Sequence, residues 1–322
     1  MRRDVVTVSA PASLSNLGPG FDCLGVAISN FGDRIRARRQ PGPEVTWEWH
    51  RSSVWSAPVR SEDNTAVVAA RSMLRRLDIA TGVHLEISKQ GRAGSGLGSS
   101  AASAVAAALA VAALEGRELE KDVIREAALD GEQAASAARH GDNVLPSLYG
   151  GFVLAQSDRL EFSRRIDCPT RLHLAIILPD VDVLTREARG LLPREIPLDA
   201  AVRHASLLGM LVNAICCGNA SDIGHLVMCD EIVEPKRAVL VTAYQDIRSS
   251  AVHAGAHGVA LSGSGPAMFA VCPTSESASE VTRAMQHACA HRGMESIART
   301  SSVDTSGARI DTETGQGGDW PW

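Results

Sequence analysis

The chain has 322 residues, enough for two domains, and its 45% hydrophobic and 21% charged residues exclude a disordered or fibrous protein. A net charge of −5 with a sequence pI near 6.1 argues against a nucleic-acid partner. Seven scattered cysteines without CxxC spacing, no apolar leader, and no apolar run longer than residues 101–114 lead us to expect a cytoplasmic protein that does not enter a membrane.

Alternating and turn-forming residues predict strands near the start of the chain. Val5–Val8 should form an opening strand that ends at Pro11, and residues 26–28 and 34–38 should form two more. The last of these strands carries alternating arginines, namely Arg34, Arg36 and Arg38. Because charges on one face keep an edge strand solvated, we favour an edge strand over a phosphate-binding patch here.

Helical patterns dominate the next hundred or so residues. Asp63 or Asn64 should cap a helix that runs to Leu77, and the alternation in Val83–Ile87 predicts a half-buried strand. Further helical patterns cover residues 99–114, 119–129 and 131–140.

The second half alternates strands with helices, which indicates an α+β sandwich with helices on one face of a sheet. Strands are expected over residues 152–155, 172–178, 259–261, 268–271 and 296–299. Helices are expected over residues 198–216, about 237–253 and 278–290.

A glycine-rich segment between a predicted strand and the helix from Ser99 suggests a phosphate site. It reads Gly94-Ser95-Gly96-Leu97-Gly98-Ser99-Ser100-Ala101-Ala102. Glycines let the backbone approach a ligand, and the helix start offers unpaired N–H groups and a positive dipole end. No lysine follows as in a Walker loop, and the spacing is not the GxGxxG of a Rossmann turn. The alternative is a plain glycine turn whose serines act only as caps.

Two other segments carry candidate site residues. Near the N-terminus, Asn16 and Asp22 lie in a turn-rich stretch and could bind a substrate hydroxyl and ammonium, or merely close turns. Toward the C-terminus, the turn Ser262-Gly263-Ser264-Gly265 joins two predicted strands and could let a second domain touch the phosphate end of the site, or be an ordinary hairpin turn.

These three segments, in this order, resemble the three motifs of the GHMP kinases. Further segments are similar to the homoserine kinases within that superfamily, and the likeness covers the chain from about Val5 to Ile310. The segments are Asn16–Asp22, Gly131–Glu132, His140–Val144, Thr185–Arg189 and Glu234–Arg237.

The resemblance implies a two-domain α+β GHMP kinase fold. Residues 1–165 would form the ATP-binding domain, an α/β domain with a left-handed βαβ unit, and residues 166–310 a ferredoxin-like α+β sandwich. Residues 311–322 match nothing in the family and are expected to be a disordered tail. The left hand comes from the resemblance alone, since right-handed crossovers are the general rule.

The resemblance also implies the site. The segment Gly94–Ala102 would bind the phosphates of ATP, and Ser100 and Glu132 would hold Mg²⁺, which prefers hard oxygen ligands. The L-homoserine pocket would use Asn16, Asp22, His140, Asn143, Thr185, Arg189 and Arg237. Glu132 could instead be an ordinary solvated helix acid, and His140 a structural histidine.

The expected chemistry is in-line attack of the substrate hydroxyl on the γ-phosphate. Positioning and charge stabilisation dominate phosphoryl transfer, so no strong protein base is required. Asn143 stands where other GHMP kinases carry a catalytic Asp, so the catalytic set would be Asn143, Glu132 and Ser100, with Asp142 pointing elsewhere.

The sequence departs from the family at Leu14, where a small hydroxyl residue is usual and where the larger side chain could narrow the substrate pocket. Gln90-Gly91 also replaces a common Ile-Pro before the glycine segment.

Alternative functions remain open from the sequence. They are a GHMP kinase for another small hydroxy amino acid, a catalytically silent metabolite sensor of the same fold, and, less favoured by charge, a nucleic-acid binder. The expected partners are a small-molecule substrate and, from the family, a second copy of the chain in a homodimer.

Overall fold

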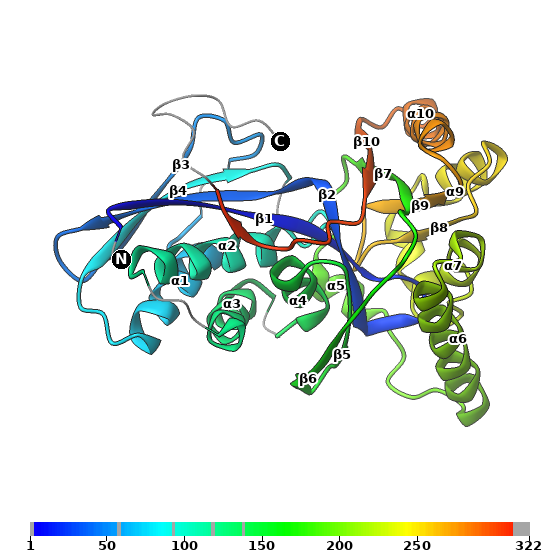
Figure 1. Cartoon of the computed structure of the whole chain (residues 1–322). Helices are drawn as coiled ribbons and strands as arrows, with labels where there is room; N and C mark the ends of the chain where they lie inside the picture. The colour runs from blue at the N-terminus through cyan, green and yellow to red at the C-terminus, as the bar shows by residue number, and fades with distance from the viewer. Residues whose placement is uncertain (1–2, 57–58, 92–93, 117–119, 137–138, 312–322) are drawn as a thin grey trace.

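Two β-sheets lie side by side and organise the chain (Figure 1). The computed structural model describes residues 3–56, 59–91, 94–116, 120–136 and 139–311. The larger sheet has the strand order β11-β1-β2-β4-β3, and β5 and β6 extend it from β2. Its strands are β1 (Val5–Asn16), β2 (Gly20–Gln40), β3 (Val45–Trp49), β4 (Gly82–Lys89), β5 (Phe152–Gln156), β6 (Arg159–Ile166) and β11 (Arg309–Ile310).

The first two strands form one long antiparallel hairpin, and two expectations about them are wrong. β1 does not end at Pro11, because the register shifts directly after this residue and the irregularity accommodates an imino acid without an N–H. β2 is not an edge strand, because it pairs with β1 on one side and β4 on the other. Its arginines mark the outer face of a central strand, where Arg36 reaches Glu86 of β4 at 3.5 Å.

Four helices cover the other face of the larger sheet. They are α1 (Thr65–Arg76), α2 (Ser99–Leu114), α3 (Lys121–Ser136) and α4 (Gly141–Tyr149). The limits of α2 are those expected, and Asn64 caps α1 by accepting a hydrogen bond from the amide of Ala66 at 3.1 Å. α2 is buried almost all round, because its alanines allow α1, α3, α4 and the sheet to approach closely. The helical pattern expected over residues 131–140 instead ends α3, and His140 precedes α4.

The smaller sheet is antiparallel throughout, with the order β10-β7-β9-β8. Its strands are β7 (His173–Pro179), β8 (Gly258–Leu261), β9 (Met268–Cys272) and β10 (Ser296–Ser302). Helices α6 (Leu198–Cys217) and α7 (Ala220–Val227) pack on one face, and α9 (Tyr244–His253) and α10 (Ser275–His291) on the other (Figure 1). The expectation of helices on one face only is therefore wrong. β7 is apolar on both sides, so both faces need cover.

The helix expected over about 237–253 is broken into three pieces. α8 (Glu234–Arg237) is followed by a 3₁₀ turn over Ala238–Leu240, and α9 starts only at Tyr244. Asp230 fixes the start of α8, since its carboxylate accepts hydrogen bonds from the amides of Val233 and Glu234. The break leaves Arg237 near the turn between β8 and β9.

The chain returns to the larger sheet at its C-terminal end. β11 pairs with β1, and Asp311 accepts hydrogen bonds from the hydroxyl of Ser9. The rest of the tail expected to be disordered, residues 312–322, lies outside the described residues. The division of the chain at residue 165 and the hand of the βαβ unit stay predictions.

Candidate active site

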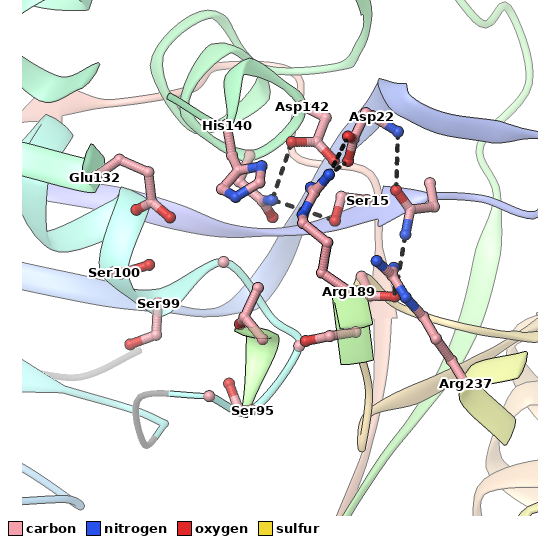
Figure 2. A pocket seen from close by; sticks show the side chains of 18 residues that line it. Ser15, Asp22, Ser95, Ser99, Ser100, Glu132, His140, Asp142, Arg189 and Arg237 are labelled. Carbon is pink, nitrogen blue, oxygen red and sulfur yellow. Dashed lines mark hydrogen bonds and ion pairs between the residues drawn. The ribbon is translucent and has the colours of Figure 1, made fainter. Parts of the chain in front are cut away.

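The three motifs meet in one place, as expected (Figure 2). The amide of Ser13 donates to the carbonyl of Leu97 at 3.0 Å, so the end of β1 is joined to the glycine segment. The turn between β8 and β9 contacts both, through Gly263 N to Ser15 O at 3.0 Å and Ala267 N to Ser95 O at 3.1 Å. A single pocket lies where they converge.

Two glycines of the central segment are required by their surroundings. Gly96 has φ +79°, and a Cβ there would stand 2.6 Å from the carbonyl oxygen of Ser262. Gly98 has φ +59°, and a Cβ there would collide with the hydroxyl of Ser13. Both positions combine a left-handed backbone with a close neighbour, so only glycine fits.

The start of α2 is suited to an anion. Gly98 occupies the N-cap position, and no side chain caps the helix. The N–H groups of the first turn and the positive dipole end therefore face the pocket. The pocket is lined by Gly94, Ser95, Gly96, Gly98, Ser99 and Ser100. Leu97, Ala101 and Ala102 were expected among the phosphate-binding residues, but their side chains are buried in the core, so they can offer only backbone groups.

Glu132 and Ser100 lie together at one end of the pocket (Figure 2). Glu132 is 5% exposed, on α3, so it is not a solvated helix acid. Burial raises the pKa of its carboxyl group, while a hydrogen bond from Ser100 lowers it. These are the hard oxygen donors that Mg²⁺ accepts. Within the described ranges no cluster of three or more His, Cys, Asp or Glu side chains could hold a metal, so phosphate oxygens and water would have to complete its shell.

His140 lies between the acidic end of the pocket and its charged opposite end (Figure 2). Burial lowers the pKa of its imidazole, which favours the neutral ring. Its Nε2 is buried and has no hydrogen-bond partner among the residues that the structure describes. A buried ring nitrogen of this kind is suited to a ligand hydrogen bond.

The opposite end of the pocket holds two arginines. Arg189, from α5 (Thr185–Gly190), forms a two-pronged ion pair with Asp22 at 2.9 and 3.0 Å. Arg237 is 3% exposed and donates to the carbonyl of Gly263 at 2.8 Å. Both guanidinium groups lie near the ring of Phe21, 5.6 and 5.1 Å from its centroid, which supports their position by cation–π attraction.

Asn143 lies in a polar cluster at the centre. Its side-chain oxygen accepts from Ser13 at 3.0 Å, and its amide nitrogen donates to Ser15 at 3.2 Å and to Asp142 at 3.3 Å. The expectation that Asp142 points elsewhere is wrong. It lines the pocket, because both residues belong to the first turn of α4, which faces the site end-on. Burial, with the nearby Asp22 charge, raises the pKa of Asp142 to about 7.

The remaining expected residues differ in how much of their side chain a ligand could use. Thr185 lines the pocket from the start of α5. Asn16 also lines it, but its side chain already bridges the amide of Asp22 at 3.1 Å and the carbonyl of Gly263 at 3.0 Å. Leu14 does not narrow the pocket. Strand alternation turns it into the core, where it is fully buried, while Ser15 faces the site.

Comparisons with known proteins show the family to which the chain is similar. The family model described as "GHMP kinases N terminal domain" matches residues 64–151, and the one described as "GHMP kinases C terminal" matches residues 211–291. The homoserine kinase of Pyrococcus abyssi is 35% identical over 316 residues, which cover 97% of this chain and 98% of that protein. The homoserine kinase of Halobacterium salinarum is 40% identical over 268 residues, 83% of this chain and 84% of that one.

Solved structures give the same result. The crystal structure of homoserine kinase from Cytophaga hutchinsonii superimposes with a TM-score of 0.90 at 36% identity, covering 97% of this chain and 98% of that one. An L. major mevalonate kinase structure in complex with R-mevalonate has a TM-score of 0.76 at 17% identity, covering 92% of this chain and 96% of that one, which is a likeness of fold alone. The expected two-domain α+β fold is confirmed.

Proposed function

Because the chain belongs to the GHMP kinases, and within them to the homoserine kinases, we propose that the pocket at the start of α2 is where it transfers the γ-phosphate of ATP to the hydroxyl of L-homoserine. The product is O-phospho-L-homoserine, an intermediate of threonine biosynthesis. The supporting observation is that one pocket holds both an uncapped helix start, suited to phosphate, and a carboxylate–guanidinium pair, suited to an amino acid.

The nucleotide would bind through the backbone. ATP is the phosphate donor in this family. The amides of Gly96, Gly98, Ser99 and Ser100 can donate to its phosphate oxygens, whereas that of Leu97 already donates to the hydroxyl of Ser95. The α2 dipole favours the negative charge of the phosphates. Close neighbours at Gly96 and Gly98 hold this bend in place, so little reorganisation is needed as charge develops.

Ser100 and Glu132 would hold Mg²⁺. Mg²⁺ bound there would neutralise phosphate charge. Glu132 can serve as a ligand when it is ionised, and a cation in the site favours that state against the burial that raises its pKa.

The charged amino-acid end of the substrate would replace an ion pair within the protein. In the structure Asp22 and Arg189 bind each other. A zwitterion can replace both contacts at once, with its carboxylate on Arg189 and Arg237 and its ammonium on Asp22 and Asp142. A ligand with only one charge would leave one member of the pair without a partner, which favours amino acids over sugars or mevalonate.

The hydroxyl end would then point toward α2. Asn143 is held by Ser13 and Ser15, so its amide has a fixed orientation for the substrate hydroxyl. Thr185, Asn16 and the buried Nε2 of His140 would shape the rest of the pocket. With the groups fixed in this way, positioning supplies most of the catalysis.

A direct assay separates this function from its alternatives. The protein is incubated with Mg-ATP and a panel of homoserine, serine, threonine and mevalonate, and products are identified by mass. We expect homoserine to be phosphorylated far faster than the others. Preference for another member of the panel would indicate a different GHMP kinase, and binding without turnover would indicate a metabolite sensor.

We also propose a homodimer in the cytoplasm. Among the described residues one helix, α6, is long and apolar enough to cross a membrane by length and composition alone. It lies at the outer edge of the molecule (Figure 1). Most of it is exposed, and large apolar side chains such as Val202 and Met210 are in solvent. The same surface carries the exposed ion pair Asp199–Arg203, which disfavours a lipid environment. A second copy of the chain fits both features.

Sedimentation of the variant Val202→Glu tests this assembly. We expect the protein to sediment as a dimer and the variant as a monomer with unchanged activity per chain. A monomeric parent protein would contradict the dimer, and flotation with lipid vesicles would show that a membrane covers α6 instead.

A further inference from the structure

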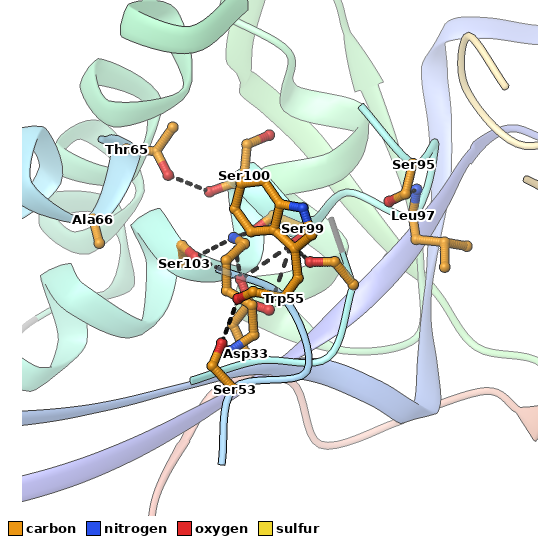
Figure 3. Close-up of polar contacts among 12 residues, drawn as sticks. Asp33, Ser53, Trp55, Thr65, Ala66, Ser95, Leu97, Ser99, Ser100 and Ser103 are labelled. Carbon is orange, nitrogen blue, oxygen red and sulfur yellow. Dashed lines mark hydrogen bonds and ion pairs between the residues drawn. The ribbon is translucent and has the colours of Figure 1, made fainter. Parts of the chain in front are cut away.

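A buried ion pair lies beneath the first turn of α2. The ammonium of Lys89, at the end of β4, is 2.7 Å from the carboxylate of Asp33 on β2. It also donates to the carbonyl of Ser99 at 3.1 Å and to the hydroxyl of Ser103 at 2.7 Å. The side chains of Lys89 and Asp33 are 6% and 1% exposed. Figure 3 shows Asp33, Ser99 and Ser103 converging under the helix start.

This cluster determines where Ser99 points, the first of the two adjacent serines at the start of α2. Asp33 accepts a hydrogen bond from the hydroxyl of Ser99 at 3.2 Å, on the side of α2 that faces the sheet. The carbonyl of Ser100 is held from the other side by the hydroxyl of Thr65 at 3.0 Å. The hydroxyl of Ser100 is therefore the one left facing Glu132 (Figure 2).

Lys89 does not take the place of a Walker lysine. An ammonium has three N–H donors, and here all three have buried protein acceptors in Asp33, Ser99 and Ser103. Lys89 can therefore affect nucleotide binding only indirectly, by holding the first turn of α2 and by its charge.

The charge of the pair bears directly on anion binding. Asp33 alone would place a buried negative charge below a site for a triphosphate, and Lys89 cancels it. The electrostatic interaction between a buried charge and bound phosphates persists over roughly 10 Å, because little water lies between them to screen it.

We propose that Lys89 and Asp33 are positioning residues for the nucleotide: their neutral pair fixes the first turn of α2 and leaves its positive end uncancelled. The proposal rests on the proposed phosphate site. It predicts opposite effects of removing each charge, whereas residues with a merely structural role would both weaken binding when replaced.

Three variants test the sign. Lys89→Met leaves the negative charge, Asp33→Asn leaves the positive charge, and the double variant removes both. Affinity for the magnesium complex of a non-hydrolysable ATP analogue is measured by calorimetry, with KM for homoserine alongside. One unit charge at roughly 10 Å should change affinity on the order of tenfold. We expect weaker binding for Lys89→Met, tighter binding for Asp33→Asn, and near parental binding for the double variant, with KM for homoserine unchanged in all three.

A second charged cluster supplies the control. Arg76, Asp130 and Ser72 form a similar basic–acidic–serine group between α1 and α3, and none of them lines the pocket. Arg76→Met should lower the melting temperature without changing nucleotide affinity. Should Lys89→Met not fold, Asp33→Asn and the double variant still decide the sign.

Weaker or unchanged nucleotide binding by Asp33→Asn would overturn the proposal. Failure of the proposed function is seen separately. In that case the parental protein itself would neither bind the nucleotide analogue nor phosphorylate homoserine.

Discussion

Replacing Arg189 with Met should separate recognition of the substrate carboxylate from folding. The Arg189–Asp22 pair is short but partly solvated, with side chains 41% and 26% exposed. Partly exposed pairs contribute at most about 1 kcal/mol to the free energy of unfolding. The melting temperature of Arg189→Met should therefore stay within a few degrees of the parental value.

The effect on catalysis should be much larger. A hydrogen bond to a charged group contributes about 1.5–3 kcal/mol, and Arg189 can offer two to a carboxylate. Part of this is offset, because substrate must first displace Asp22. A net loss of about 2–3 kcal/mol corresponds to a fall of roughly 30–150-fold in kcat/KM for homoserine.

The assay compares homoserine with 3-aminopropan-1-ol, which has the same ammonium and hydroxyl but no carboxylate. Arg189→Met should reduce kcat/KM for homoserine and leave that for 3-aminopropan-1-ol nearly unchanged, so that the ratio between them shrinks. Arg186→Met is the matched control, because Arg186 lies on the same helix and does not line the pocket. Equal losses for both compounds, or no loss for homoserine, would refute the carboxylate assignment.

Three more variants follow from the site and its support. Glu132→Gln should lose most turnover while keeping its fold, since an amide is a poor Mg²⁺ ligand; near-normal kcat at saturating Mg²⁺ would count against this. Burial raises the pKa of Glu234 from 4.5 to about 7. Between these pH values the folded state binds more protons than the unfolded state, so the free energy of unfolding falls as pH rises, by about 3 kcal/mol in total. Glu234→Gln should therefore flatten the pH dependence of the melting temperature. If the melting temperatures of the parental protein and the variant changed with pH in parallel, Glu234 would not be the cause of the dependence. Gly96→Ala should raise KM for ATP at least about tenfold, because its Cβ would crowd the carbonyl of Ser262. Gly42→Ala is the control, because Gly42 also has a positive φ but open space around it, and its KM for ATP should not change. Similar kinetics for both variants would show that the close approach at Gly96 is unimportant.

Local patterns predicted the elements whose stability is local. The alanine run and the glycines before it determine α2 to the residue, and the Asn64 cap determines the start of α1. The path of β1 past Pro11 could not be predicted, because the irregularity depends on pairing with β2. The break before α9 also depends on groups outside this segment, since Asp230 accepts a hydrogen bond from the amide of Glu234 at the start of α8 and Arg237 donates to the carbonyl of Gly263.

For the candidate site, the sequence indicated which residues meet in the pocket better than it indicated how they contact one another; their roles stay predictions. Most of the residues that the motif resemblance named line one pocket, although they come from distant parts of the chain. The expectations for Leu14 and Asp142 were wrong, although local rules of strand and helix geometry could have placed both residues correctly. Strand alternation puts Leu14 opposite Ser15, and a helix that meets a pocket at its N-terminus presents consecutive residues of its first turn. The pairing of Asp22 with Arg189 has no local signal, because 167 positions separate them.

A crystal structure with a magnesium-bound, non-hydrolysable ATP analogue tests the account most directly. We predict that the phosphate oxygens accept hydrogen bonds from the backbone amides of Gly96, Gly98, Ser99 and Ser100, with the metal on Ser100 and Glu132. A nucleotide bound elsewhere, with this bend empty, would contradict the assignment of the whole site.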